Sequence, residues 1–376
     1  MKKRLTLLSL LLLFTMTAMT KTLVDGIYYN LNGSDNTAEV TNQLDGTSAN
    51  YRGDIVIPAS IWAYGVVYTV TSIGERAFER SSNLTSIEIP NSVTSIGGYA
   101  FAYCFGLTSI EIPTSVTEIG KWAFIGCSSL TNIEIPNSVT SIGERAFEGC
   151  RSLTSIEIPN SVTSIGYAFC NCYGLTSIVV EEGNSYYDSR ENCNAIIETS
   201  SNTLVVGCQN TVIPNSVTLI GDGAFFGRPN LTSIEIPTSV TEIGDYAFAA
   251  CYGLTGIEIP TSVTEIGDCA FISCSGLTSI TMQRATPPTV LGTLFLDCSK
   301  LETIYVPVGA SEAYNVAPWN RYNIVEREVA GIEEVTQEEW PADVYDLNGR
   351  MVKAQAENLD ELPKGVYIVN GKKFVK

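Results

Sequence analysis

The chain of 376 residues contains no histidine. This absence excludes Ser-His and Cys-His nucleophile pairs, histidine metal sites and the usual general base near neutral pH. A pair of carboxylates could still hydrolyse a glycosidic bond, since glutamate is plentiful. The glutamates recur at regular intervals, however, instead of forming one unusual pair in one place. We therefore predict that the chain is not an enzyme and that it needs no cofactor or metal.

Positive charge is also scarce, because 22 Lys and Arg stand against 40 Asp and Glu, which gives a net charge of −18. A chain this acidic is repelled by phosphate backbones and by anionic lipid. Nucleic acid is therefore not an expected partner. The hydrophobic share of 45% still indicates an ordered protein with a large buried core.

Long hydrophobic runs are limited to one, "LTLLSLLLLFTMTAM", near the start of the chain. The basic residues Lys2, Lys3 and Arg4 precede it, and a polar stretch with small residues follows. The run is too short to span a bilayer comfortably, and this arrangement is typical of a secretory signal peptide. We predict a signal peptide over residues 1–20 and an exported mature chain without a transmembrane segment.

Repetition is what the sequence has in abundance. The stretch "SIGERAFERSSNLTSIEIPNSVT", residues 72–94, is followed at once by a near copy of itself. The signature "IEIP" and its close relatives recur about every 23 residues between residues 54 and 307. Self-similarity at such a period indicates a repeat architecture, here of about eleven coils. A repeated unit builds an extended surface, which favours binding over catalysis.

Each coil has the pattern of two strands and a turn. In "LTSIEI", Leu84, Ile87 and Ile89 alternate with Ser86 and Glu88, which is typical of a half-buried strand. The segment "SVTSIG" predicts a second short strand, and "ERAFER" predicts one helical or 3-10 turn. No coil can bury its apolar face alone, so stacked coils place like residues over like. The prediction is a β-rich solenoid with a column of phenylalanines and one broad ribbon of parallel strands.

The pattern LxxIxIP followed by SVTxIGxxAFxxC resembles the BspA-type leucine-rich repeat, found in exported and surface proteins of bacteria. The resemblance implies a leucine-rich repeat solenoid, a role in adhesion or in binding host or neighbouring-cell macromolecules, and no enzyme activity. The partner would be an extracellular protein, for example a host matrix protein, or a glycan. In the alternative of a glycan-binding or nutrient-capture protein, Trp122, Tyr103 and Tyr252 would stack on sugars, unless they only pad the turn.

Glutamate occupies the outward strand position of successive coils, and this acidic stripe is the best candidate for a binding surface. Its members are Glu88, Glu111, Glu134, Glu157, Glu235 and Glu258. Neighbouring carboxylates about 5 Å apart repel each other by roughly 0.8 kcal/mol before salt screening. A basic partner or bound cations would relieve that repulsion. The alternative is a passive, solvated face whose charges were copied with the repeats.

One cysteine per coil recurs three residues after the column phenylalanine. This set comprises Cys104, Cys127, Cys150, Cys172, Cys251, Cys274 and Cys298. Stacked side chains about 4.8 Å apart are too distant for an unstrained disulfide, whose Cβ atoms lie about 3.8 Å apart. We therefore predict a column of buried free thiols.

An insertion, residues 181–210, interrupts the array. If its strands pair across a turn at Ser200 and Ser201, Cys193 faces Cys208, and the two either form a disulfide or remain free thiols. Tyr186 and Tyr187 of the same insertion are candidate contact residues. The insertion could equally be a hairpin that patches one coil.

The two ends differ from the repeats. Residues 21–53 predict an N-terminal β cap, with a hairpin around Asn32 and Gly33 that covers the first coil. Residues 54–327 form the predicted solenoid, and residues 328–376 predict an acidic linker and a small β unit with two Asn-Gly turns. This tail resembles the C-terminal sorting domain of Bacteroidetes-type exported proteins, which implies delivery to the outer surface. The sequence leaves the oligomeric state open.

Overall fold

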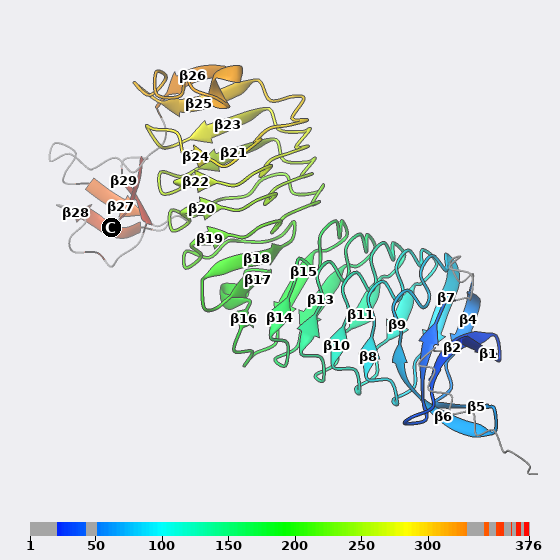
Figure 1. The fold of residues 1–376 in the computed structure, drawn as a ribbon. Helices are drawn as coiled ribbons and strands as arrows, with labels where there is room; N and C mark the ends of the chain where they lie inside the picture. The colour runs from blue at the N-terminus through cyan, green and yellow to red at the C-terminus, as the bar shows by residue number, and fades with distance from the viewer. Residues whose placement is uncertain are drawn as a thin grey trace, which may run out of the picture.

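The computed structural model describes residues 21–42, 51–328, 342–345, 351–356, 362, 366–369 and 372–375. Stacked coils form an elongated solenoid that runs from the N-terminal strands to β26 (Figure 1). Its regular structure is nearly all β-strand, and the described residues include two short 3-10 helices, η1 (Arg190–Asn192) and η2 (Trp319–Arg321). The predicted leucine-rich repeat solenoid of about eleven coils is confirmed. The predicted signal peptide lies outside the described residues.

Three antiparallel strands cover the N-terminal end: β1 (Lys21–Val24), β2 (Ile27–Asn32) and β3 (Thr37–Thr41). The backbone of Asn32 pairs with Thr37, so the turn lies between them. β3 then pairs in parallel with β6 (Val66–Ile73), and β5 (Ser60–Ala63) forms a hairpin with β6. The N-terminal strands therefore cover the short-strand side of the first coil, whereas its ribbon strand β4 (Arg52–Val56) pairs, among the described strands, with β7 (Asn83–Glu88) alone.

The second, shorter strands of successive coils form the longest hydrogen-bonded sheets of the described chain. β6 continues into β8 (Ser95–Ile96), β10 (Glu118–Ile119), β12 (Ser141–Ile142) and β14 (Ser164–Ile165). All these pairs are parallel, and the isoleucine that ends each strand stands beside the next one. A second series begins within the insertion: β16 (Tyr187–Asp188), β17 (Ala195–Glu198), β18 (Thr203–Gly207), β19 (Leu219–Ile220), β20 (Glu242–Ile243), β22 (Glu265–Ile266) and β24 (Thr289–Val290).

The "IEIP" ribbon is divided, which differs from the single broad ribbon that the sequence predicted. Its hydrogen-bonded groups are β4 (Arg52–Val56) with β7 (Asn83–Glu88), β9 (Ser109–Glu111) with β11 (Asn132–Glu134), β13 (Ser155–Ile158) with β15 (Ser177–Val180), and the four strands β21 (Gly256–Ile259), β23 (Ser279–Met282), β25 (Thr303–Pro307) and β26 (Asn323–Arg327). Column phenylalanines stack at 5.1–5.4 Å between ring centroids. This spacing is 5.4 Å between Phe147 and Phe169, where β13 pairs with β15, and 5.3 Å between Phe124 and Phe147, where β11 and β13 do not pair. The division of the ribbon therefore does not follow from the ring spacing.

The phenylalanine column forms the core, as predicted, and its rings are almost parallel, at 0° between Phe78 and Phe101 and 7° between Phe101 and Phe124. The segments that carry these rings are turns closed by hydrogen bonds from residue i+3 to residue i, as in the predicted single 3-10 turn, for example from the N–H of Ala77 to the carbonyl oxygen of Gly74 at 3.2 Å. The second residue after the glycine has a positive φ in successive coils, for example 59° at Arg76 and 56° at Tyr99. A left-handed residue at this point stops a right-handed helix from continuing.

The insertion bends the solenoid. β16, β17 and β18 lead by pairing into β19 on the side of the short strands. The insertion also covers the ribbon strand β15, because Asn194 Oδ1 accepts the N–H of Ile178 at 2.7 Å and Ser189 Oγ accepts the N–H of Val180 at 3.0 Å. On the opposite side the turns of the flanking coils touch directly, because the backbone N–H of Asn171 donates to the carbonyl oxygen of Phe226 at 3.1 Å. Extra material at the strands, with direct contact at the turns, makes a wedge, and the array changes direction at β16–β18 (Figure 1). The core is accordingly split into two clusters.

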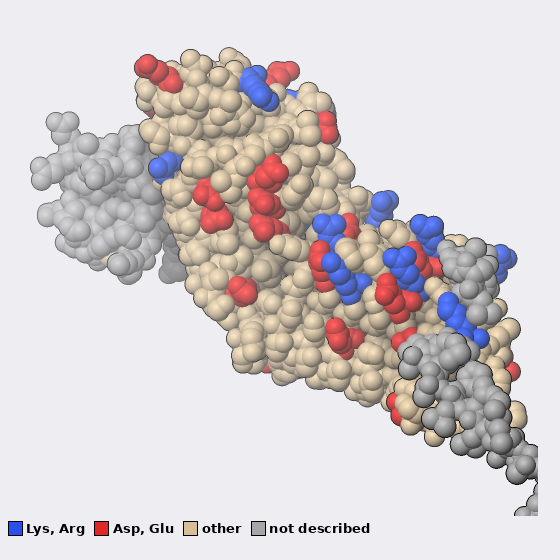
Figure 2. Space-filling model, in the orientation of Figure 1, with Lys and Arg blue, Asp and Glu red and all other residues tan. Residues whose placement is uncertain are grey.

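Charge is distributed unevenly between the two parts of the solenoid. Basic and acidic side chains alternate over the part before the bend, whereas acidic side chains stand together without basic neighbours over the coils just after it (Figure 2). The ion pairs before the bend include Arg76 with Glu79 and Arg145 with Glu148. The turn face after the bend is therefore the more negative of the two.

The C-terminal unit is a small antiparallel sheet. Its strands, in the order β28–β27–β29–β30, are β27 (Ala342–Tyr345), β28 (Met351–Ala356), β29 (Val366–Val369) and β30 (Lys372–Val375). The predicted small β unit is consistent with this sheet. Val369 pairs with Lys372, and both predicted Asn-Gly turns lie outside the described residues.

Candidate interaction surface

The acidic stripe lies on the exposed side of the ribbon. All six of its glutamate side chains are exposed: Glu88, Glu111, Glu134, Glu157, Glu235 and Glu258. Within the ladders Glu111 stands opposite Glu134, whereas Glu157 stands opposite Val179 and Glu258 opposite Thr281. The glutamates thus occupy the same position in their repeats, but neutral side chains such as Val179 and Thr281 interrupt the stripe in space.

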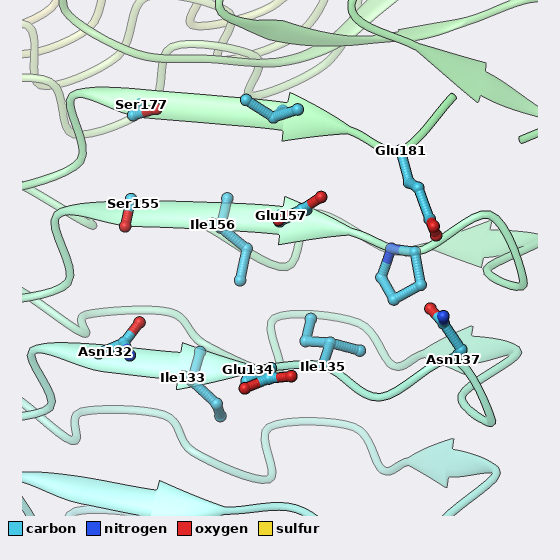
Figure 3. A pocket seen from close by; sticks show the side chains of 12 residues that line it. Asn132, Ile133, Glu134, Ile135, Asn137, Ser155, Ile156, Glu157, Ser177 and Glu181 are labelled. Carbon is cyan, nitrogen blue, oxygen red and sulfur yellow. The ribbon is translucent and has the colours of Figure 1, made fainter. Parts of the chain in front are cut away.

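A shallow hollow of about 490 Å³ opens in the ribbon across β11, β13 and β15 (Figure 3). β11 pairs with β9 and β13 with β15, so the hollow spans the place where the two ladders are not joined. Its charged lining residues are three carboxylates, Glu134, Glu157 and Glu181. Glu181 is fixed at one end, because its Oε2 accepts the backbone N–H of Asn160 at 2.9 Å.

The hollow offers polar contacts rather than a metal cage. Amide and hydroxyl groups of Asn132, Ser155 and Ser177 line one end of the three strands, and Asn137 and Glu181 lie at the other end (Figure 3). Among the residues that the structure describes, no three acidic, cysteine or histidine side chains are placed to hold a metal ion together. The arrangement can accept hydrogen bonds and cationic groups from a partner that lies along the ribbon.

The two tyrosines of the insertion have different environments. Tyr187 is only 7% exposed, and its hydroxyl oxygen accepts the backbone N–H of Ile165 at 3.2 Å. It closes the end of β14 and is not available as the contact residue that the sequence suggested. Tyr186 is 53% exposed and remains a candidate contact. An ion pair of 2.7 Å between Asp188 and Arg190 helps to fix this loop.

Cys193 and Cys208 are both free, buried thiols, and no disulfide joins them in the structure. The strands do pair about the expected turn, with Glu198 opposite Thr203. A β-bulge then shifts the register by one residue, so Ala195 stands opposite Gly207. The extra residue moves Cys208 out of the position opposite Cys193 that the predicted pairing required.

The predicted cysteine column is buried and free of disulfides. Its role was missed by the sequence analysis: each thiol donates a hydrogen bond to the carbonyl oxygen of the column phenylalanine in the preceding coil. Cys104 donates to Phe78 at 3.1 Å, and Cys127 donates to Phe101 at 3.1 Å. Burial raises the pKa of the Cys104 thiol to about 12, so the proton that makes this bond is retained.

Arg228 takes the cysteine position in the coil after the insertion and is 2% exposed. Its Nη2 donates to the carbonyl oxygen of Phe169 at 2.9 Å, its Nε to Gly207 at 2.9 Å, and its Nη1 to Phe226 at 3.1 Å. These acceptors belong to the coil before the bend, to the insertion and to the coil after the bend. One side chain therefore joins the two parts of the solenoid where the thiol is absent.

Two of the three aromatic residues considered for sugar stacking are engaged within the chain. Trp122 stacks on Tyr99 with ring centroids 4.8 Å apart, and Lys121 Nζ lies 4.0 Å from its ring centroid. Tyr103 contacts Phe105 at 6.1 Å between centroids. Tyr252 is exposed. The interpretation that these rings pad the turn fits Trp122 and Tyr103.

Residues 68–199 and 201–324 match the family model described as BspA type leucine rich repeat region (6 copies). The chain belongs to the BspA-type leucine-rich repeat family. No curated protein matches it. None of the helices in the described part of the chain is long and apolar enough to cross a membrane.

Several solved structures are similar to this BspA-type chain. A leucine-rich repeat protein from Bacteroides ovatus is 32% identical with a TM-score of 0.56, over 76% of this chain and 70% of that one. A leucine rich cell surface protein from Faecalibacterium prausnitzii is 29% identical with a TM-score of 0.50, over 83% and 95%. The pneumococcal vaccine antigen PcpA, at 19% identity, TM-score 0.58 and coverage of 83% and 99%, shows a likeness of fold alone.

Proposed function

We propose that the protein is an exported, surface-associated adhesin or interaction scaffold, and that its strand ribbon binds an extracellular protein of the host or of a neighbouring cell. The observation that carries this proposal is the hollow across β11, β13 and β15, whose charged lining is entirely acidic. Exposed glutamates extend the same surface along the solenoid. Many weak, repeated contacts suit an array in which each coil presents nearly the same groups.

The expected partner carries a basic patch, and a host matrix protein of that kind is one candidate. Charge complementarity would raise the association rate and make binding weaken with salt. We further propose that the protein has no enzymatic activity, because the ribbon repeats one arrangement of side chains instead of assembling a unique one. The cell-surface designation of the Faecalibacterium relative supports a surface location for this protein too.

The deciding experiment replaces Glu111, Glu134 and Glu157 together by Gln and measures capture by immobilised extracellular matrix proteins at low and high salt. We expect weaker capture and a flatter salt dependence with an unchanged melting temperature. Replacing Glu75, Glu79 and Glu144 on the turn face by Gln is the matched control, because it removes the same charge elsewhere. Unchanged capture by the stripe variant would contradict the proposal and leave the stripe a passive, solvated face.

The alternative of glycan binding or nutrient capture is tested in the same assay. Free sugars should not compete if a basic protein patch is recognised, whereas competition by sugars without salt dependence would favour the alternative. Tyr252 is then the first residue to replace, because it is the exposed member of the three aromatic residues.

We also propose that the signal peptide at residues 1–20 directs export and that the C-terminal β unit acts in sorting to the outer surface, as its resemblance to Bacteroidetes-type sorting domains implies. Deleting residues 328–376 should shift the protein from the cell surface to another fraction, measured by surface proteolysis and immunoblotting. Surface retention of the truncated chain would contradict this role.

A further inference from the structure

The turn face carries a second row of side chains, which we call the turn ladder. In most coils its member is the residue two places after the recurring turn glycine; in one coil Tyr167 follows its glycine, Gly166, directly. The members of the turn ladder are Arg76, Tyr99, Trp122, Arg145, Tyr167, Gly223, Tyr246 and Cys269. All these positions have a positive φ, between 44° and 60°. Flat groups stack along it, since the Arg76 guanidinium lies 4.8 Å from the Tyr99 ring centroid and Tyr99 stacks on Trp122.

Gly223 is the rung of this ladder that has no side chain. A Cβ at Gly223 would approach its nearest neighbours, among them Tyr167 Cδ1 and Cys170 Sγ, no closer than 3.8 Å. The space in front of Gly223 is therefore open. The backbone of Gly223 has the same positive φ that Tyr99 and Arg76 adopt in other coils, so a side chain could be held there. A hollow of about 450 Å³ lies here, and the rungs on either side of Gly223, Tyr167 and Tyr246, both line it.

The walls of the hollow are aromatic and exposed enough to be reached. Tyr167 is 45% exposed and Tyr246 is 43% exposed. Tyr167 is held in place, because its hydroxyl donates to Asp222 Oδ2 at 3.1 Å. Two tyrosine rings that flank an open rung can stack on one inserted flat group.

The charge of the hollow is negative. Arg145 and Glu148 at its edge pair with each other at 3.5 Å, so their charges offset. Asp222 and Asp245 remain, and no ion pair among the described residues involves either one. Their Oδ1 atoms accept backbone N–H groups of the next coils, from Asp245 at 2.8 Å and from Asp268 at 2.7 Å. These bonds orient the carboxylates without neutralising them.

A neighbouring glutamate is affected by this negative field. The pKa of Glu242 is raised, first by burial and then by the charges of Glu265, Asp222 and Asp245. A cation placed beside Asp222 and Asp245 would relieve this repulsion. An uncharged ring in the same place would stack on the tyrosines but would leave the carboxylates uncompensated.

We propose that this hollow receives an arginine side chain of a partner protein, whose guanidinium stacks between Tyr167 and Tyr246 and donates hydrogen bonds to Asp222 and Asp245. Arginine fits better than lysine because its planar fork can both stack on an aromatic ring and pair with carboxylates. The chain itself places a guanidinium at this rung in Arg76 and Arg145. The site lies on the turn face, so it is independent of the function proposed for the ribbon.

The test uses the full chain and a peptide, acetyl-Gly-Arg-Gly-amide, with its neutral citrulline counterpart, observed by saturation-transfer NMR. We expect the arginine peptide to bind with a dissociation constant in the millimolar range and the citrulline peptide to bind at least fivefold more weakly. Two outcomes would overturn the proposal: no binding of the arginine peptide at about 20 mM, which is above the expected dissociation constant, or equal binding of the two peptides.

Variants locate the binding. Gly223→Tyr fills the open rung with a side chain that the same backbone conformation holds at Tyr99 and Tyr246, and it should abolish arginine-peptide binding. Asp222→Asn with Asp245→Asn should weaken binding at least fivefold while keeping an oxygen for each backbone N–H. Asp268→Asn is the matched control, because Asp268 makes the same type of bond, to the N–H of Thr293, outside the hollow. Retained binding in Gly223→Tyr, or preferential binding of a neutral sugar such as maltose, would contradict the arginine site.

Discussion

Cys127 donates its thiol proton to the carbonyl oxygen of Phe101, a residue 26 places earlier in the chain and one coil away. The same bond recurs along the column, with Cys150 to Phe124 at 3.4 Å and Cys274 to Phe248 at 3.1 Å. A thiol at this position therefore gives the buried carbonyl of Phe101 a second donor, beside the backbone N–H of Cys104, and links two successive coils.

The first prediction concerns this bond. Cys127→Ala should lower the free energy of unfolding by about 0.5–1.5 kcal/mol, because the buried carbonyl of Phe101 loses one of its two donors and keeps only the N–H of Cys104. Cys127→Ser should cost less, since serine keeps a donor and the first coil already has the buried Ser81 at this position. Urea denaturation followed by circular dichroism measures both. Equal losses for the two variants would mean that the hydrogen bond contributes nothing and that only packing matters.

The second prediction concerns the phenylalanine column. Phe124→Ala should lower the free energy of unfolding by about 3–5 kcal/mol through lost burial and a cavity, and amide exchange should accelerate in the two adjacent coils. Thr108→Ala on the exposed surface is the control and should change little. An unchanged melting temperature for Phe124→Ala would contradict the core role of this ring.

The third prediction concerns Arg228. Arg228→Ala leaves the carbonyl oxygens of Phe169, Gly207 and Phe226 without this donor, so the loss of stability should be at least about 3 kcal/mol. Because the three acceptors lie on both sides of the bend, calorimetry should resolve two unfolding transitions instead of one. Arg151→Ala, which removes an exposed arginine stacked on Tyr173, should keep the wild-type profile. A single transition at the wild-type temperature for Arg228→Ala would rule out this joining role.

The fourth prediction concerns pH at the C-terminal end of the solenoid. Hydrogen bonds from the backbone N–H of Gly309, and then from the side chain and N–H of Ser311, lower the pKa of the Glu326 carboxyl group to about 2, well below its ordinary range. A carboxyl group with a depressed folded pKa contributes stability above its unfolded pKa and loses it as the pH falls toward the folded value. The difference in melting temperature between wild type and Glu326→Gln should therefore shrink between pH 4.5 and pH 2. Glu302→Gln controls for the removal of one charge, and a constant difference for Glu326→Gln would contradict the assignment.

The sequence predicted the features that depend on the repeat period. The alternation in "LTSIEI" places Leu84 and Ile87 in the core, and the fixed interval between Phe78, Phe101 and Phe124 makes them stack. These outcomes need only the rule that like residues lie over like. The exposed glutamates of the stripe follow from the same alternation.

Features that depend on single residues were not predictable in this way. The disulfide hypothesis for Cys193 and Cys208 assumed a constant register, and one bulge residue removed it. The burial of Tyr187 depends on a contact with Ile165, 22 residues earlier, which periodicity does not reveal. Division of the ribbon into separate ladders was not visible either, because each coil carries nearly the same strand sequence. Gly223 was visible as a departure from the repeat, but its open rung required the neighbouring Tyr167 and Tyr246 in space.

The wedge at β16–β18 has a consequence for how such a protein can change in evolution. Each coil bonds only to its neighbours, so an in-frame duplication of one repeat lengthens one arm and leaves the contacts of Arg228 untouched. The lengths of the two arms are thus adjustable separately, while the angle between them stays fixed by the insertion. Lineages that vary their repeat number would change the reach of the ribbon without having to reinvent its direction.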